Sequence, residues 1–360
     1  MTKKNNAITI WRIVFTYVIM VYHFDNKYVI SQIYGLNFGW YIGVEFFFIV
    51  SGYLLYVNFD KLAQRCHSGW DYFVYRYGRI YPYYLGAFIL SFIMWGKAGG
   101  FSLGDMAKKL SYDFFEIFAM HGIGLDDGWS YINNTSWFIS VLFISGFIIF
   151  HCLVKWKDNF INFVAPLLII ICYSFLYRNM GKVSAVVQIT DFYLNWPLMR
   201  GLADMCMGIF AARLTYFIQE KCNRTGILRV AGTMGLLFVI LSSMVYGESK
   251  RDFLYVIIMT FSVAVAFLPS GHKIFQYRWI HRWSGITMCM YLIHDAFRSY
   301  IFPIYLGIPE SMGMKLVYML LYMVVVTVCA FLFEKLVTWI VGAGKKMLQG
   351  MAVTLTNENS

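Results

Sequence analysis

The sequence predicts an all-α fold, a polytopic membrane helical bundle of about ten transmembrane helices. Of its 360 residues, 59% are hydrophobic and only 14% are charged, whereas an average soluble domain is about 45–50% apolar and about 25% charged. Even a large soluble domain leaves much of its surface in water, so it could not bury this excess. Ten spans of about 20 residues would use about 200 residues, which is close to the number of hydrophobic residues in the chain. The composition therefore excludes a soluble enzyme, a disordered protein and a disulfide scaffold.

Ten apolar segments are candidate spans. Each is long enough to cross a bilayer as a helix, the one open-chain structure that satisfies backbone groups away from water. In chain order they are 8–27, 38–57, 72–95, 137–154, 161–177, 193–216, 227–246, 253–269, 285–305 and 315–341. We assign residues 1–345 to one transmembrane domain and residues 346–360 to a short polar cytoplasmic tail.

The distribution of basic residues predicts the orientation. An even number of spans places both termini on one side, and the loops on that side carry about twice as many Lys and Arg residues as the others. Cytoplasmic loops are enriched in these residues, so we expect an integral protein of the cell (plasma) membrane with both termini in the cytoplasm. The net charge of +11 then reflects these loops and not nucleic-acid binding, because no basic run exceeds two residues.

The longest loop, residues 96–136, lies outside the cell in this arrangement. It contains a predicted short helix over 106–120 and a polar stretch over 126–135. Long loops without secondary structure are uncommon unless they have a function. We therefore expect this loop to cover a site.

The first span contains Arg12 and His23, and ionisable side chains inside spans are expensive and are functional candidates by default. The eleven residues from Arg12 to His23 make about three helical turns, so both project from nearly the same face, about 16 Å apart along the axis. Two purely structural roles stay open as alternatives. Arg12 could be an interfacial anchor, and His23 could be a buried histidine bonded to a neighbouring helix.

The second and third spans add Glu45, Ser51, Gly52, Arg76 and Arg79. The two arginines share a helix face and, with Arg12, place three guanidinium groups at one membrane depth. Guanidinium is the preferred partner for phosphate, so we predict a phosphate-bearing cytoplasmic ligand whose reactive end reaches towards His23. The alternatives are a positive-inside anchor for the arginine pair and close helix packing for Ser51 and Gly52.

Later spans contain two more polar sets, Arg200 with Asp204, and a group in the ninth span. That group consists of Tyr291, His294, Asp295 and Arg298. Each set can neutralise itself locally, so a structural role stays open beside a functional one. Trp137 lies at the end of the long loop, where aromatic residues often mark the membrane interface.

These residues resemble the acyltransferase-3 family of integral-membrane acyltransferases over almost the whole chain, from about residue 8 to 340. The motifs that carry the resemblance are Arg12 followed by ten residues and His23, Phe47-Phe48-Ile49-Val50-Ser51-Gly52, and Arg76-Tyr77-Gly78-Arg79. Weaker matches surround Trp137, Arg200 with Asp204, and Tyr291 with His294.

The resemblance implies a membrane-bound O-acyltransferase. Such an enzyme moves an acyl group, usually acetyl, from cytoplasmic acyl-coenzyme A to a hydroxyl of a cell-surface glycan or its lipid-linked precursor. It implies acetyl-coenzyme A as donor co-substrate. The seven cysteines follow no metal-binding spacing, so we expect no metal. Direct transfer and a covalent enzyme intermediate both stay open.

Three sets of site residues follow. We expect a catalytic set of His23, Arg12 and Glu45, with His23 as the base because its pKa lies near neutral pH, and either Glu45 or His294 to orient it. We expect a coenzyme site of Arg76, Arg79, Ser51 and Gly52, with Arg12 also holding phosphate. The expected substrate-binding residues are Trp137, Arg200, Asp204, Tyr291 and His294.

The main alternative function is a proton-coupled transporter, in which the intramembrane Glu, Arg and His residues would form an ion pathway. Transporters often show repeated hydropathy between their two halves and pairs of broken helices. The sequence has neither feature in a convincing form, which favours the acyltransferase.

Overall fold

The computed structural model describes residues 6–31, 36, 38–125, 131–184, 195–222, 225–268 and 278–358, and within these ranges the chain forms helices and turns and no β-strand. A helix corresponds to each of the ten predicted spans. These helices are α1 (Asn6–Tyr28), α2 (Gly43–Val57), α4 (Gly69–Gly99), α7 (Trp137–Asn159), α8 (Ala165–Asn179), α9 (Trp196–Lys221), α10 (Thr225–Tyr246), α11 (Arg251–Ala266), α12 (Arg278–Ala296) and α14 (Met312–Glu358). The prediction of an all-α bundle is confirmed.

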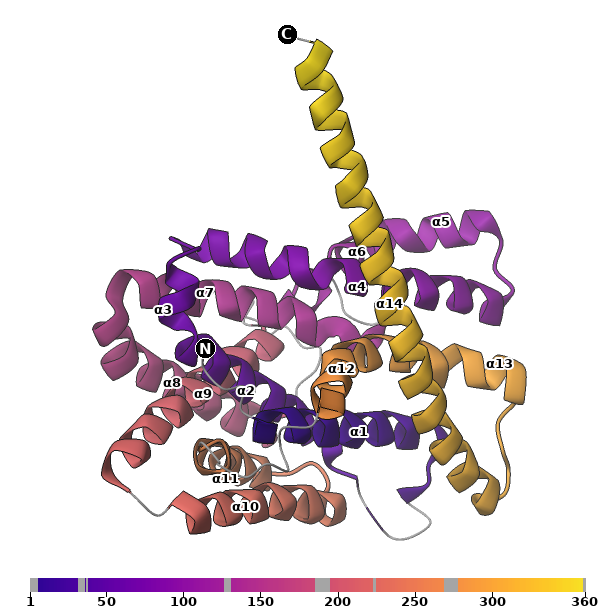
Figure 1. Ribbon diagram of the computed structural model, residues 1–360. Coiled ribbons are helices and arrows are strands. Elements are labelled where there is room, and N and C mark those ends of the chain that lie inside the picture. Colours follow the sequence, from indigo (N-terminus) through magenta and orange to yellow (C-terminus); the bar gives the residue numbers. More distant parts are fainter. Residues whose placement is uncertain are drawn as a thin grey trace.

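Four shorter helices and several single turns connect the long ones. The short helices are α3 (Phe59–Ala63), α5 (Leu103–Tyr112), α6 (Phe114–Ile117) and α13 (Phe302–Leu306). A π-helical segment, η7 (Phe297–Ile301), carries α12 on into α13. Figure 1 shows the long helices packed together, with the C-terminal part of α14 projecting beyond them. This helix runs on to Glu358 and so includes most of the predicted polar tail.

The bundle is apolar outside and carries charged groups inside. On α14, the side chains of Leu320, Val324, Val328 and Leu332 recur every fourth residue and are each more than half exposed. Arg200, in contrast, is 1% exposed. Soluble monomers rarely expose contiguous apolar surface of this kind, so a lipid environment accounts for it.

Six helical segments of the described chain are long and apolar enough to cross a membrane, judged by length and composition. They are Ala7–Tyr28, Trp40–Val57, Asn134–Asn179, Trp196–Lys221, Thr225–Tyr246 and Met312–Met347. The segment Asn134–Asn179 has 46 residues and contains both α7 and α8. The chain is thus an integral membrane protein by its helices, and ten remains the predicted number of spans.

Two glycines bring α2 and α9 together near the centre of the bundle. A Cβ atom added to Gly52 would lie 1.9 Å from the backbone oxygen of Met205, and one added to Gly208 would lie 2.0 Å from that of Ile49. Neither position can accept a larger side chain without moving backbone. Small residues allow such close contact between helices in membranes, and this contact fixes α2, which lines the site described below.

The long loop differs from the single helix predicted over 106–120. Helix α5 starts earlier, at Leu103, because Ser102 forms a capping box with Asp105. It ends at Tyr112, and after Asp113 the short helix α6 follows. Residues 126–130 of the predicted polar stretch lie outside the described residues.

Candidate active site

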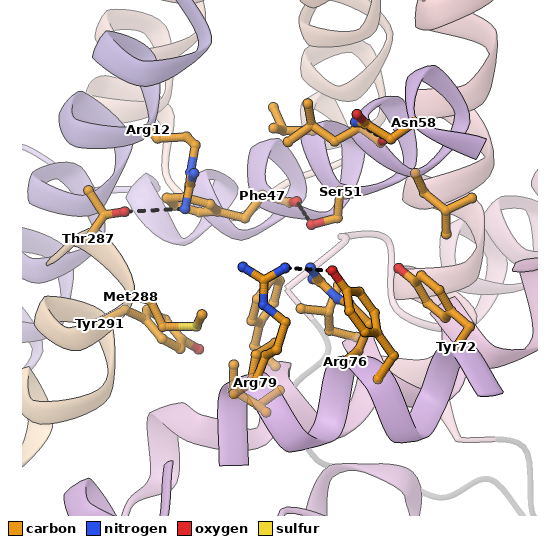
Figure 2. A pocket seen from close by; sticks show the side chains of 18 of the residues that line it. Arg12, Phe47, Ser51, Asn58, Tyr72, Arg76, Arg79, Thr287, Met288 and Tyr291 are labelled. Carbon is orange, nitrogen blue, oxygen red and sulfur yellow. Dashed lines mark hydrogen bonds between the residues drawn. The ribbon is translucent and has the colours of Figure 1, made fainter. Parts of the chain in front are cut away.

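A cavity of about 520 Å³ lies among α1, α2, α3, α4, α7 and α12. The arginines predicted to share one depth meet there. Figure 2 shows Arg12 on one wall pointing towards Arg76 and Arg79, which project from α4 on the opposite wall. Lys61 and Arg65 also line the cavity. Five cations from three parts of the chain therefore face one space.

Among the described residues, none of these cations forms a salt bridge with a carboxylate. Arg12 Nη2 donates to Thr287 Oγ1 at 3.4 Å, and Arg79 Nη1 donates to the Tyr75 hydroxyl at 2.7 Å. No Asp or Glu is among the residues that line the cavity, and within the described chain no salt bridge involves any of the five cations. An uncompensated cluster of this kind attracts a polyanion, and its arginines suit phosphate oxygens.

The rest of the cavity wall is largely apolar. Side chains from α1, α2, α4 and α7 provide it, namely Ile19, Val44, Phe47, Val50, Ile80, Phe138, Ile139 and Leu142. Ser51 is also on the wall, but its hydroxyl donates to the Phe47 carbonyl at 2.7 Å. Gly52 is not a lining residue, and its packing against Met205 gives it a structural reason to be glycine.

A pair of histidines lies next to this cavity. Ile19 lines it, and His23 follows four residues later on the same face of α1, about 6 Å along the axis. The His23 and His294 rings have centroids 5.2 Å apart. Tyr291 belongs to both places, because it lines the cavity and its ring centroid lies 5.6 Å from that of His294.

The hydrogen bonds of His294 define its tautomer. Nδ1 contacts the Tyr291 carbonyl oxygen, which can only accept, so Nδ1 carries the proton. Nε2 is then the basic nitrogen, and it is buried without a hydrogen-bond partner in the described residues. Beside it Arg298 pairs with Asp295 and donates from Nη1 to the His23 carbonyl at 2.9 Å. Arg298 and Asp295 therefore tie α1 to α12 beside the two histidines.

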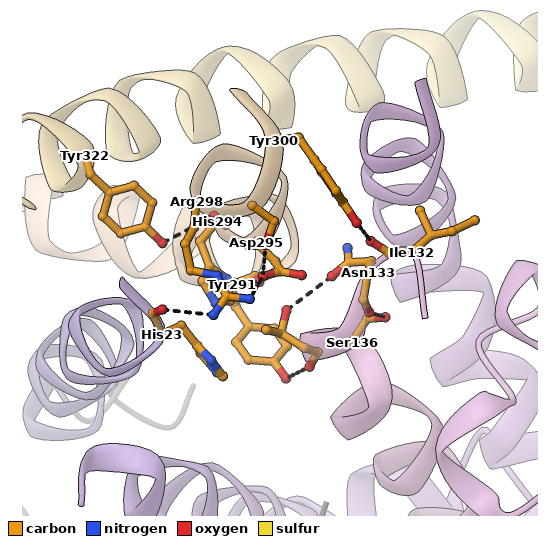
Figure 3. Close-up of polar contacts among 12 residues, drawn as sticks. His23, Ile132, Asn133, Ser136, Tyr291, His294, Asp295, Arg298, Tyr300 and Tyr322 are labelled. Carbon is orange, nitrogen blue, oxygen red and sulfur yellow. Dashed lines mark hydrogen bonds and ion pairs between the residues drawn. The ribbon is translucent and has the colours of Figure 1, made fainter. Parts of the chain in front are cut away.

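The described end of the long loop is fastened beside these histidines (Figure 3). Both carboxylate oxygens of Glu116 accept backbone N–H groups, from Ile132 at 2.9 Å and from Asn133 at 2.7 Å. Asn133 Nδ2 donates to the Leu292 carbonyl at 2.9 Å, and the Tyr291 hydroxyl donates to the Thr135 carbonyl. The loop end is therefore tied directly to α12.

Burial shifts the pKa of two ionisable groups in this loop, Glu116 and His121. Burial raises the pKa of Glu116 to about 8, against the two backbone N–H bonds that favour its charged form. Burial lowers the pKa of His121 to about 3. His121 Nε2 lies 3.2 Å from the Ser136 hydroxyl. The loop is therefore built around a neutral imidazole and a carboxyl group that burial biases towards its neutral form.

A second polar cluster is fully buried between α2 and α9. Glu45 Oε1 accepts from Arg200 Nε, and the Arg200 guanidinium lies 5.2 Å from the centroid of the Trp137 ring. Asp204 accepts from the Tyr173 hydroxyl. Arg200 thus pairs with Glu45, 155 residues away in the chain, although the spacing suggested Asp204 as its partner.

The predicted site residues therefore fall into three places. Arg12, Arg76, Arg79, Ser51 and Tyr291 line the cavity. His23 and His294 form the adjacent pair. The remaining predicted residues lie in or beside the contact between α2 and α9. Gly52 is at the close approach of the two helices. The buried cluster contains or contacts Glu45, Arg200, Asp204 and Trp137. Of the two groups proposed to orient His23, His294 is its neighbour and Glu45 is engaged by Arg200.

Sequence reasoning missed several residues of the site. In the sequence, Lys61 and Arg65 are basic residues of a predicted cytoplasmic loop, and their i, i+4 spacing is the one signal that sets them apart. Thr287 and the loop residues Glu116 and Asn133 carry no sequence signal of their own. Among the described residues, no group of three or more His, Cys, Asp or Glu side chains could hold a metal ion.

The fold and the site together define the class, a helical membrane protein with a cationic cavity beside a pair of histidines. A family model described as an acyltransferase domain, that of the acyltransferase-3 family, matches residues 5–335. This is nearly the whole chain, so the chain belongs to the acyltransferase-3 family and is a membrane acyltransferase. Comparisons with curated proteins and with solved structures give no significant match. The family assignment does not favour the transporter alternative.

Proposed function

We propose that this membrane acyltransferase transfers an acyl group, acetyl in the first instance, from cytoplasmic acyl-coenzyme A to a hydroxyl of a cell-surface glycan or its lipid-linked precursor. The observation that supports the proposal is that the histidine pair lies next to the cationic cavity, with Tyr291 lining the cavity and contacting His294. The cations that line the cavity suit the phosphates of the coenzyme, and the apolar wall suits its uncharged arm and the acyl group.

The chemistry follows from this placement. His23 takes the proton of the acceptor hydroxyl as the hydroxyl oxygen attacks the thioester carbon. The C–S bond then breaks, and the coenzyme leaves as a thiolate that recovers the proton from His23. Histidine suits both steps because its ordinary pKa, about 6.5, lies near neutral pH. The His294 ring lies beside the His23 ring, and its Nε2, which has no hydrogen-bond partner in the described residues, would orient His23 while Arg12, Arg76 and Arg79 hold the donor.

The long loop supports an acceptor site on the opposite side of the histidines. Its described end binds α12 through Asn133 and through Tyr291, which itself lines the donor cavity. An acceptor hydroxyl that arrives beneath this loop end would meet His23 from the side away from the cations. We therefore place donor and acceptor on opposite faces of the membrane, with both termini in the cytoplasm and the protein in the plasma membrane.

One assay tests the function. Purified protein in detergent should bind coenzyme A and should release free thiol from acetyl-coenzyme A, slowly with water alone and faster with the acceptor. A protein that neither binds coenzyme A nor cleaves its acetyl thioester would contradict the proposal.

Reporter fusions test the orientation on which the proposal depends. Fusions within residues 58–70 should report cytoplasm, and fusions within residues 122–132 should report the outside. A cytoplasmic signal from 122–132 would place the loop on the donor side and contradict the two-sided arrangement.

A further inference from the structure

The cations of the cavity divide into two groups. Arg12, Arg76 and Arg79 project from two long helices, α1 and α4, that face each other across it. Lys61 and Arg65 come from α3 and the turn that follows it, and both side chains are exposed. Arg12 and Arg76 are half-buried and Arg79 is exposed. The first group therefore lines the walls that α1 and α4 form, and the second group lines the part of the same cavity that α3 and its following turn form.

The pair Lys61 and Arg65 is set up to act on one ligand group. The two residues are four apart, which places them on one helical face, and the Arg65 backbone N–H donates to the Leu62 carbonyl at 2.9 Å, so the turn continues as far as Arg65. The nearest acidic residue in the sequence, Asp60, is engaged by Lys157 at 3.3 Å. Neither Lys61 nor Arg65 forms a salt bridge in the described part of the chain.

We infer that Lys61 and Arg65 bind the 3′-phosphate of coenzyme A, an inference that rests on the proposed function. The coenzyme carries its thioester at one end, its pyrophosphate in the middle and its 3′-phosphorylated ribose at the other end. With the acyl group against the apolar wall beside Tyr291 and the pyrophosphate between Arg12, Arg76 and Arg79, the ribose phosphate falls at the part of the cavity that α3 and its following turn line. A phosphate monoester carries nearly two negative charges at neutral pH, which matches two cations.

The pair therefore determines which carrier the enzyme accepts. The 3′-phosphate is the group that distinguishes coenzyme A from 3′-dephospho-coenzyme A. An ordinary loop anchor that contacts membrane lipid would make no such distinction, because both compounds share every other group.

Calorimetric binding of coenzyme A and of 3′-dephospho-coenzyme A to detergent-purified protein tests the inference. Wild-type protein should prefer coenzyme A by about tenfold or more, in keeping with hydrogen bonds between charged groups. The Lys61→Ala/Arg65→Ala double variant should lose that preference while it keeps the wild-type affinity for the dephospho compound, which also shows that it is folded. Lys155→Ala is the matched control, since Lys155 is an exposed lysine of α7 that does not line the cavity, and it should behave as wild type.

Failure of the 3′-phosphate assignment gives a different binding result from failure of the acyl-coenzyme A proposal. Equal affinity of wild-type protein for the two compounds, or an equal loss of both in the double variant, would overturn the assignment of the 3′-phosphate and leave the acyl-coenzyme A proposal standing. Absence of binding of either compound to wild-type protein would overturn both.

Discussion

Arginine has two contrasting environments in this protein, the cationic cavity and the buried cluster between α2 and α9. In the cavity, Arg12, Arg76 and Arg79 contact hydroxyl groups or open space and no carboxylate in the described chain. In the buried cluster, Arg200 is paired with Glu45 and stacked near the Trp137 ring.

In a membrane protein, a buried arginine that is paired with a carboxylate can be told apart from one that borders an open cavity. A buried cation without a partner is too costly to keep, so Arg200 needs Glu45 for the bundle to hold together. A cation that borders an open cavity stays hydrated until an anion replaces the water. The partner of each arginine, and not its presence inside a span, therefore indicates its role.

The largest expected effect comes from breaking the buried pair. Arg200→Ala leaves Glu45 buried without its cation, and removal of one partner of such a pair costs about 3–5 kcal/mol. The apparent Tm of the detergent-purified variant should fall well below that of wild type. Arg79→Ala is the control, because Arg79 is exposed and surface changes usually cost less than about 0.5 kcal/mol. Equal losses of Tm in the two variants would remove the distinction between the two regions.

A smaller effect is expected on ligand binding. Arg79→Ala should weaken coenzyme A binding by about 1.5–3 kcal/mol, the usual cost of a lost hydrogen bond to a charged group. Equilibrium titration measures this directly. Unchanged affinity would return Arg79 to the role of an interfacial anchor.

Arg79→Lys should fall between Arg79→Ala and wild type in the same titration. Lysine keeps the charge, but its ammonium cannot make the planar two-pronged contact of guanidinium with phosphate. Affinity fully restored by lysine would mean that Arg79 contributes only its charge.

The smallest effect is local and concerns the pH dependence of the long loop. The folded pKa of Glu116, about 8, is above its ordinary value of 4.5, so its contribution to stability is present below pH 4.5 and is lost as pH rises to about 8. His121, with a folded pKa of about 3 and an ordinary value of 6.5, acts in the opposite sense, but only below about pH 6.5. Between pH 6.5 and 8 the Glu116 effect therefore remains alone.

Hydrogen exchange at the Ile132 and Asn133 amides, corrected for intrinsic rates, measures this effect because both amides donate to Glu116. Their protection should fall from pH 6.5 to 8 and level off above. The Glu116→Gln variant should lose that pH dependence. Protection that rises with pH in wild-type protein would contradict the burial argument.

The fold and the meeting of three arginines could be predicted from local information. Apolar runs indicate the helices, and helical spacing with membrane depth predicts that Arg12, Arg76 and Arg79 lie together, and all three line one cavity. The pairing of Arg200 with Glu45 could not be predicted, because it joins residues 155 positions apart. The same limit applies to the contact of His23 with His294 and to the binding of the loop end by Glu116, which depend on tertiary packing and leave no periodic signal.

The rate of acetyl transfer, measured against acetyl-coenzyme A concentration for His23→Ala and Arg79→Ala, tests most directly whether the cavity binds the donor and His23 performs the chemistry. Loss of a general base typically lowers the rate by about 10²–10⁴-fold, and His23→Ala should stay slow at every donor concentration because it keeps the donor site. Arg79→Ala should recover part of its rate when the donor is raised, since its defect is in binding. A His23→Ala enzyme with full transfer, or an Arg79→Ala enzyme that no donor concentration improves, would contradict the division between a cationic donor cavity and a histidine that performs the chemistry.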